Sequence, residues 1–180
     1  KDNLIKEGIE KDKVSLVGDV MYDSVLFYTQ LAEEKSTIMT DLDLKKENYF
    51  LSTIHRQENT DDIDKLKNII NALNHAPYPV ILPLHPRTRK IIESNQIKIQ
   101  NNIKIINPVG YLDMLILENN AYKIITDSGG IQKEAYFFGV DCITLRNETE
   151  WSELVDIGVN ILVGSKQKMI IDAMNKNKNK

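Results

Sequence analysis

The chain has 180 residues, of which 42% are hydrophobic and 27% charged, as is typical of a globular domain with a core of its own. Its formal net charge of −3 provides no broad basic surface, so nucleic acid is not expected as the main partner. No apolar run approaches the roughly 20 residues that a membrane-spanning helix needs, so no membrane segment is expected. The single cysteine, Cys142, lies in an apolar run and is expected to be a small buried side chain, which fits a reducing cytoplasm.

Because the chain begins with Lys1 rather than methionine, we expect it to be part of a longer protein. Residues 3–8 predict a short helix, residues 13–17 alternate as a strand does, and residues 20–34 have helical periodicity. Residues 36–47 are polar and irregular. A strong strand candidate at residues 49–54 leads into the loop 55–59, after which Asp61 or Asp62 can cap a helix that extends to residue 74.

The second half of the chain continues this alternation. A strand at residues 79–84 ends at His85, and Pro86 suits the first turn of a helix to residue 94. A strand at 103–106 precedes a helix that ends near residue 118, and a strand at 122–126 precedes a helix that reaches residue 138. The last predicted elements are a strand at 141–145, a helix at 152–157, a strand at 160–163 and a helix at 166–175.

This order of elements predicts an α/β fold, in which a parallel sheet of six or seven strands has helices on both faces, as in Rossmann-like domains. One domain is expected over residues 1–175, with a polar tail at 176–180. In such folds ligands bind beyond the carboxyl ends of the strands.

Unusual residues gather at those strand ends. In chain order the strands are followed by Gly18-Asp19, the loop 55–59, residues 85–87, residues 108–111, Ser128-Gly129-Gly130 and residues 146–151. A purely structural domain has no reason to concentrate histidine, arginine and glutamate at one edge of its sheet. The pattern therefore indicates a ligand-binding or catalytic site.

The segment Ser128-Gly129-Gly130 passes directly from a strand into a helix. Free backbone N–H groups and the positive end of the helix dipole favour an anion such as phosphate there, and glycine lets a ligand approach the backbone. Glu134 lies one helical turn further on, where its carboxylate can accept hydrogen bonds from both hydroxyls of a ribose. An ordinary capped helix is the alternative.

Three residues of the loop 55–59 are candidates for chemistry. His55 can exchange protons near neutral pH, while Arg56 and Glu58 can set its charge or hold a phosphate. The alternative is a capping histidine beside a solvent-facing Arg–Glu pair.

Other strand ends carry further candidates. His85 can contact a substrate or merely form a local backbone hydrogen bond. Tyr111 can stack on a base whose edge meets free backbone groups of Val109 and Gly110, or it can be a tyrosine at the edge of the core. Arg146 can neutralise a diphosphate, with an ion pair to Glu148 or Glu150 as the competing arrangement.

Five segments together resemble the non-hydrolysing UDP-N-acetylglucosamine 2-epimerase family. They keep that family's order and spacing over nearly the whole chain: Thr53-Ile54-His55-Arg56-Gln57-Glu58-Asn59, His85-Pro86, Thr126-Asp127-Ser128-Gly129-Gly130-Ile131-Gln132-Lys133-Glu134-Ala135, Leu145-Arg146-Asn147-Glu148-Thr149-Glu150 and Leu162-Val163-Gly164.

The resemblance implies a two-domain enzyme of glycosyltransferase-B-like fold, of which this chain is the C-terminal, UDP-binding domain. Such enzymes interconvert UDP-GlcNAc and UDP-ManNAc by eliminating UDP to form 2-acetamidoglucal and then adding it back. The resemblance implies a substrate between the two domains, no metal ion or cofactor, and a homodimeric full-length enzyme in the cytoplasm.

The same resemblance implies roles for single residues. Ser128, Gly129 and Gly130 would hold the diphosphate, Glu134 the ribose, and the segment from Val109 through Gly110 to Tyr111 the uracil. Arg146 would lie near the nucleotide and His55 near the glycosidic oxygen. Arg56 and His85 match positions that contact a second, activating UDP-GlcNAc in some bacterial members.

The sequence also departs from the family pattern. Trp151-Ser152 stands where Arg-Pro is common, and with Lys133 and Tyr136-Phe137-Phe138 it looks more like relatives that act on UDP-2,3-diacetamido-glucuronate. The family's catalytic carboxylates belong to an N-terminal domain that is absent here, so we expect residues 1–180 alone to bind UDP weakly and not to epimerise. A glycosyltransferase and a non-catalytic UDP-sugar-binding module are the alternatives.

Overall fold

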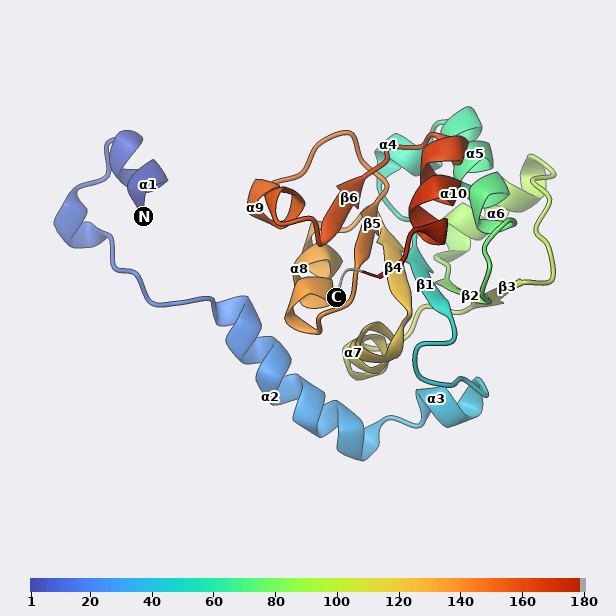
Figure 1. Ribbon diagram of the computed structural model, residues 1–180, viewed down its shortest axis with the longest axis horizontal. Helices are drawn as coiled ribbons and strands as arrows, with labels where there is room; N and C mark the ends of the chain where they lie inside the picture. The colour runs from blue at the N-terminus through green and yellow to red at the C-terminus, as the bar shows by residue number, and fades with distance from the viewer. Residues whose placement is uncertain (179–180) are drawn as a thin grey trace.

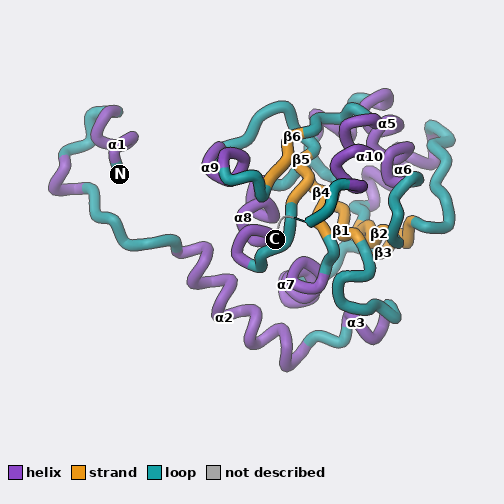
Figure 2. Tube along the Cα trace, in the orientation of Figure 1, coloured by secondary structure: helices purple, strands orange, loops and turns teal. Residues whose placement is uncertain are grey.

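A six-stranded parallel sheet forms the centre of the computed structural model, which describes residues 1–178 (Figures 1 and 2). Its neighbours are all parallel and follow the order β3-β2-β1-β4-β5-β6. The strands are β1 (Phe50–Thr53), β2 (Val80–Pro83), β3 (Ile103–Ile106), β4 (Lys123–Thr126), β5 (Cys142–Thr144) and β6 (Asn160–Leu162). The predicted fold class is confirmed.

Helices cover both faces of this sheet. On one face the core is closed by α5 (Ile63–Leu73), α6 (Pro86–Ser94) and α10 (Gln167–Asn175). On the other it is closed by α3 (Ile38–Asp41), α7 (Tyr111–Asn120) and α8 (Gly129–Phe137), and α2 (Val20–Lys35) packs outside α7 and α8 (Figure 1). The short helix α9 (Ser152–Asp156) lies beside β6.

Strand residues point alternately into the two cores, because side chains of a strand alternate between its faces. In β1, Phe50 packs with the first group of helices and Leu51 with the second. In β4, Ile125 packs with the first group of helices and Ile124 with the second. All four side chains are fully buried, which explains why these strands read as continuous apolar runs rather than as an alternating pattern.

The sheet changes its winding direction between β1 and β4. Strands β1 to β3 extend it one way along the chain and β4 to β6 the other, so the connections after β1 and β4 diverge. Divergent connections leave a crevice at the carboxyl ends of the two strands, where ligands of such folds bind. The segments that flank this point are the loop that begins at His55 and the Ser128-Gly129-Gly130 turn.

The strand predicted at residues 13–17 is wrong. The segment follows a 3-10 helix (η1, Lys11–Lys13) and stays irregular, with Leu16 and Val17 about 80% and 76% exposed. Alternation alone does not make a strand, because a strand also needs a sheet edge to pair with. Asp19, predicted to lie in a turn after this strand, caps α2 instead by accepting from the backbone N–H groups of Met21 and Tyr22.

The ends of the chain differ in how they meet the sheet. Helix α1 (Asp2–Lys6) lies apart from it, at the end of an extended segment before α2 (Figure 1). At the other end, the buried Lys123 Nζ donates to the carbonyls of Ala173 (3.1 Å) and Lys176 (2.7 Å), which fastens the end of α10 to β4. Lys178 pairs with Glu47 at 3.1 Å, while residues 179 and 180 of the predicted tail lie outside the described residues.

Candidate functional site

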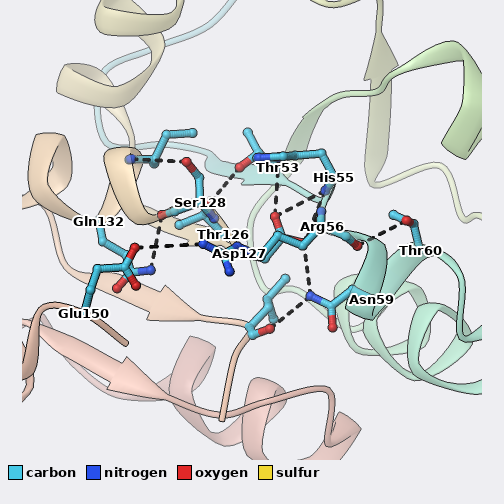
Figure 3. Close-up of polar contacts among 12 residues, drawn as sticks. Thr53, His55, Arg56, Asn59, Thr60, Thr126, Asp127, Ser128, Gln132 and Glu150 are labelled. Carbon is cyan, nitrogen blue, oxygen red and sulfur yellow. Dashed lines mark hydrogen bonds and ion pairs between the residues drawn. The ribbon is translucent and has the colours of Figure 1, made fainter. Parts of the chain in front are cut away.

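The fully buried carboxylate of Asp127, directly after β4, organises the loop that follows β1 (Figure 3). It accepts from the backbone N–H of His55 (3.2 Å), the backbone N–H of Arg56 (3.1 Å) and the Asn59 amide (3.0 Å). The same Asn59 amide donates to the carbonyl of Leu145, at the end of β5. Asp127 and Asn59 together thus connect the ends of β1, β4 and β5.

The His55 ring lies against this carboxylate, with Nδ1 3.4 Å from Asp127 Oδ1. The His55 side chain is 53% exposed, so the rest of the ring remains accessible to solvent. A carboxylate beside one ring nitrogen orients the imidazole and leaves the second nitrogen for a substrate. The arrangement is that of a histidine prepared for proton transfer or hydrogen bonding.

A second polar set joins β1, β4 and α8. The hydroxyls of Thr53 and Thr126 lie 2.6 Å apart, and Thr126 Oγ1 accepts from the Ser128 backbone N–H at 2.9 Å (Figure 3). Ser128 caps α8 through Oγ, which accepts from the Ile131 N–H at 3.5 Å. The cap fixes the direction in which the N-terminal end of α8 points.

An anion already lies at that end of α8. The Glu150 carboxylate is so close to Gly129 that a Cβ there would overlap Oε1, and it accepts from Arg146 Nη1 at 2.6 Å. Arg56 Nη2 lies 3.9 Å from the same carboxylate (Figure 3). The pKa of Glu150 lies below its usual range because its own backbone N–H and Arg146 donate to the carboxylate. Two arginines and a helix N-terminus therefore converge on one negative group.

A third set of side chains links α7 to α8. The Tyr111 hydroxyl donates to Glu134 Oε1 at 3.1 Å, and the Tyr111 ring packs edge-on against Tyr28 of α2 at 5.7 Å. Glu134 is 7% exposed, and burial raises the pKa of its carboxyl. Glu118 of α7 is fully buried, and burial together with the neighbouring Glu134 raises the pKa of its carboxyl.

Two pockets border this edge of the sheet. His55, His85 and Val109 share one of about 170 Å³. Gly110 and Tyr111 share another of about 570 Å³ with Tyr28 of α2. The predicted residues thus form three neighbouring groups, at the two histidines, at the α8 N-terminus and at Glu134.

Other predicted residues have local partners. Glu58, in the short helix α4 (Gln57–Thr60) that was expected to be loop, lies 3.7 Å from Lys65 rather than beside Arg56. His85 caps α6, its Nδ1 accepting from the Arg87 backbone N–H at 3.2 Å. Cys142 is buried as predicted, and burial raises the pKa of its thiol to about 12.

Sequence reasoning missed the roles of Asp127 and Glu118. The run Thr126-Asp127-Ser128 is typical of turn and cap residues, although an acidic side chain between a buried strand and a glycine turn has few places to point except across the sheet edge. Glu58 and Asn59 were expected at most to organise their loop, which Asn59 does through Asp127 and Leu145. Glu118 was not singled out. The signal for Glu118 was a charged residue directly after the apolar run Met114–Leu117 of a helix that covers the sheet.

None of the helices in residues 1–178 combines the length and apolar character needed to cross a bilayer.

A family model described as UDP-N-acetylglucosamine 2-epimerase matches residues 1–180. A Methanococcus maripaludis protein named as a homolog of that enzyme is 52% identical over 179 residues, which are 97% of this chain and 50% of the relative. A UDP-2,3-diacetamido-2,3-dideoxy-D-glucuronate 2-epimerase of Pseudomonas aeruginosa is 46% identical over 96% of this chain and 48% of its own length.

Solved structures agree with these matches. The UDP-GlcNAc 2-epimerase of Methanocaldococcus jannaschii, crystallised with UDP-GlcNAc and UDP, superposes with a TM-score of 0.86 at 40% identity, covering 99% of this chain and 52% of that one. A Neisseria meningitidis UDP-GlcNAc 2-epimerase bound to UDP-GlcNAc gives 0.75 at 28% identity, covering 96% of this chain and 48% of that one. The chain spans about half the length of the relatives it matches.

Proposed function

The chain belongs to the UDP-N-acetylglucosamine 2-epimerase family, and from this premise we propose that it is the UDP-binding domain of an enzyme that interconverts UDP-GlcNAc and UDP-ManNAc. The observation that carries the proposal is the convergence of Arg56, Arg146 and the α8 N-terminus on one carboxylate. Groups that hold a carboxylate in this way also suit the diphosphate of a nucleotide sugar.

The proposed binding mode follows the three groups of side chains. Ser128, Gly129 and Gly130 hold the diphosphate at the α8 N-terminus, and Arg146 neutralises its charge. To bind there, the diphosphate displaces the Glu150 carboxylate, whose exposed side chain is free to swing away.

The nucleoside then lies along α8 towards α7. Glu134 accepts the ribose hydroxyls, and the segment from Val109 to Tyr111 meets the uracil. This assignment is supported by the Tyr111–Glu134 hydrogen bond, which keeps the carboxylate on the side of the turn that carries Val109 and Gly110.

The reaction requires more than a base. The C2 proton of the sugar is not acidic, so removing it is practicable only if the C1–O bond breaks and UDP departs, which gives 2-acetamidoglucal. UDP then adds back and a proton reaches C2 from the opposite face. The charge that develops on departing UDP is stabilised by the α8 N-terminus and Arg146. His55, oriented by Asp127, lies near the glycosidic oxygen and can donate a hydrogen bond or a proton to it.

The proposal includes partners that lie outside this chain. An N-terminal domain supplies the remaining catalytic carboxylates and closes over the sugar, and the full-length enzyme is a homodimer of the cytoplasm. The half-length match to relatives supports the second domain, and the buried single cysteine fits a reducing compartment. Arg56 and His85 are also candidates for contacts to a second, regulatory UDP-GlcNAc.

The full-length enzyme tests the activity directly. Incubated with UDP-GlcNAc in heavy water, it should release UDP-ManNAc and UDP-GlcNAc that carry deuterium at C2, which mass spectrometry and proton NMR detect. A parallel assay with UDP-2,3-diacetamido-glucuronate separates the two sugars. Absence of C2 exchange with both sugars would refute an epimerase, and transfer of the sugar to an acceptor without exchange would indicate a glycosyltransferase.

The diacetamido-glucuronate is the second candidate substrate. A relative named for that activity is 46% identical, and Lys133 is held against the Trp151 ring at 4.5 Å to its centroid, at a position where this chain departs from the common family pattern. Deuterium exchange with this sugar alone would select it.

Ribose recognition has a test of its own. Glu134→Gln keeps the size of the side chain but removes the charge, so we expect UDP affinity to fall about tenfold by calorimetry. The same substitution should leave affinity for 2′,3′-dideoxy-UDP unchanged. An equal loss of affinity for both nucleotides would mean that Glu134 does not contact the ribose. A full-length protein that binds UDP but converts neither sugar would be a non-catalytic binding module.

A further inference from the structure

Glu118 is an ionisable residue that is fully buried in the core beside apolar side chains. It belongs to the face of α7 that covers the sheet, it is fully buried, and its neighbours along the helix are Leu115, Ile116 and Leu117. Within the described part of the chain, neither of its carboxylate oxygens has a hydrogen-bond donor in reach. An ionised carboxylate buried in this way would be very costly, so the group has to be stabilised by other means.

Helix α7 packs against α8, and the Glu134 carboxyl on α8 raises the pKa of Glu118, so the two carboxyl groups are neighbours. Two ionised carboxylates are both acceptors and repel each other, so contact between them requires a proton on one of the two. Glu118 is the more deeply buried and has no donor to stabilise a charge, whereas Glu134 accepts from the Tyr111 hydroxyl. The proton therefore belongs on Glu118, which then donates to Glu134.

We propose that Glu118 is a positioning residue that stays protonated and, together with Tyr111, holds the Glu134 carboxylate ready for the ribose. A carboxylate has about four lone-pair sites. If Tyr111 and Glu118 occupy two of them, two remain, as many as the vicinal hydroxyls of a ribose require. The inference rests on the proposed UDP site and adds a residue to it.

The pair makes ribose binding depend on pH. Burial first, and then the neighbouring Glu134, raise the pKa of Glu118 well above its ordinary value. The Glu118 charge raises the pKa of three further groups, Tyr49 before β1, Tyr111 on α7 and Cys142 on β5, and all three are neutral near pH 7. As pH rises through the pKa of Glu118, the donor is lost and a second charge appears beside Glu134.

Protein stability should change in the same sense. A carboxyl whose folded pKa is raised contributes stability that is complete below its unfolded pKa, which is about 4.3 for glutamate, and that is lost as pH rises through the folded pKa. A glutamine at position 118 keeps a donor for Glu134 at every pH and cannot ionise. Glu118→Gln should therefore lose less stability than the wild type as pH rises.

The experiment compares wild type, Glu118→Gln and Glu118→Met as full-length proteins. Calorimetry measures UDP-GlcNAc affinity from pH 6 to 9, because this ligand lacks the terminal phosphate of UDP, which titrates near pH 6. We expect the affinity of the wild type to fall about tenfold as pH rises from 6 to 9. Glu118→Gln should keep, at every pH, the affinity that the wild type has at low pH. Glu118→Met has no donor and should bind weakly at every pH. Unfolding midpoints at the same pH values report the proton on Glu118 without any ligand.

The possible failures can be told apart. If Glu118→Gln and wild type share one affinity profile, or if Glu118→Met binds as tightly as Glu118→Gln, Glu118 does not position Glu134 and the proposal is overturned while UDP binding stands. If none of the three proteins binds UDP-GlcNAc, the proposed function falls and the positioning role falls with it. Rescue of binding by glutamine but not by methionine is a result that a merely space-filling role does not produce.

Discussion

The Glu150 carboxylate is the residue whose position most directly reports what the α8 N-terminus can bind. It is one of the two competitors expected for Arg146, and the structure selects it over Glu148, which is exposed. It accepts from Arg146, and its Oε1 occupies the space that a Cβ on Gly129 would fill, which is where the proposed phosphate would lie. A diphosphate bound there, as proposed, would have to displace this carboxylate.

This displacement predicts that Glu150→Gln strengthens UDP binding. The variant removes the competing charge, and Arg146 is left free to meet the ligand. We expect UDP affinity to rise about threefold to tenfold by calorimetry at low ionic strength and less at high salt, because the carboxylate is partly exposed. Glu148→Gln, which removes the same charge from a neighbouring exposed position, serves as the control.

A weaker affinity in Glu150→Gln would point to the opposite role. It would mean that Glu150 mainly holds Arg146 in position for the ligand, as a carboxylate partner of an arginine often does. The control variant should leave UDP affinity unchanged in either case, so the two roles are separated by the sign of one measurement.

Helix α8 shows why an element can be predicted from sequence while its partners cannot. Its start after Ser128 follows from the cap and the two glycines, and the structure begins it at Gly129. The side chains that meet that start, Arg56 and Glu150, come from the chain after β1 and the chain after β5, which are distant in sequence. Spacing along a chain predicts local hydrogen bonds, but it cannot predict which long side chain turns towards which helix end.

The same limit explains the strand that was expected at residues 13–17. Alternating side chains are compatible with a strand, but pairing depends on whether another strand is left with a free edge beside it. The six observed strands alternate with helices that bury both sheet faces, so their apolar runs are unambiguous. Leu16 and Val17 have no such cover and remain exposed.

For helix α8 we predict that Gly129→Ala removes most of the UDP binding but changes the stability of the fold little. A Cβ at Gly129 overlaps Glu150 Oε1, the flexible end of a side chain that can move, whereas a bound phosphate in its place cannot move without losing its contacts. Alanine also favours a helix over glycine, by about 1 kcal/mol or less at this exposed end. UDP affinity should fall tenfold or more, as measured by calorimetry.

Gly130→Ala is the matched control. A Cβ there meets only Met21 Cε and Ser128 Oγ at 3.8 Å, which is ordinary contact. Its UDP affinity should change much less than that of Gly129→Ala, and both variants should unfold within a few degrees of the wild type. Equal losses in the two variants would mean that the phosphate does not sit over Gly129.

The described chain supplies a candidate site that approaches a ligand from one side. The sheet edge, the α8 N-terminus and Glu134 all belong to it, and the side chains of His55 and Glu150 at this place are partly exposed. Apolar side chains of the segment before α2 and of α2 itself are also uncovered, among them Leu16 at about 80%, Val17 at 76% and Phe27 at 65% exposure. The relatives that this chain matches are about twice as long.

A site that contacts the sugar from one side limits the chemistry, because inverting C2 needs a proton to leave from one face of the sugar and another to arrive at the opposite face. We therefore predict that residues 1–180, produced alone, bind UDP measurably but incorporate deuterium at C2 at a rate lower by a factor of about 10³ or more than the full-length enzyme. That factor is within the range contributed by a missing general acid or base. Calorimetry with UDP establishes that the isolated chain is folded and competent to bind, and mass spectrometry after incubation with UDP-GlcNAc in heavy water measures the exchange. Exchange within tenfold of the full-length rate would show that both faces of C2 are served from this half, and His55 would then be the first residue to replace.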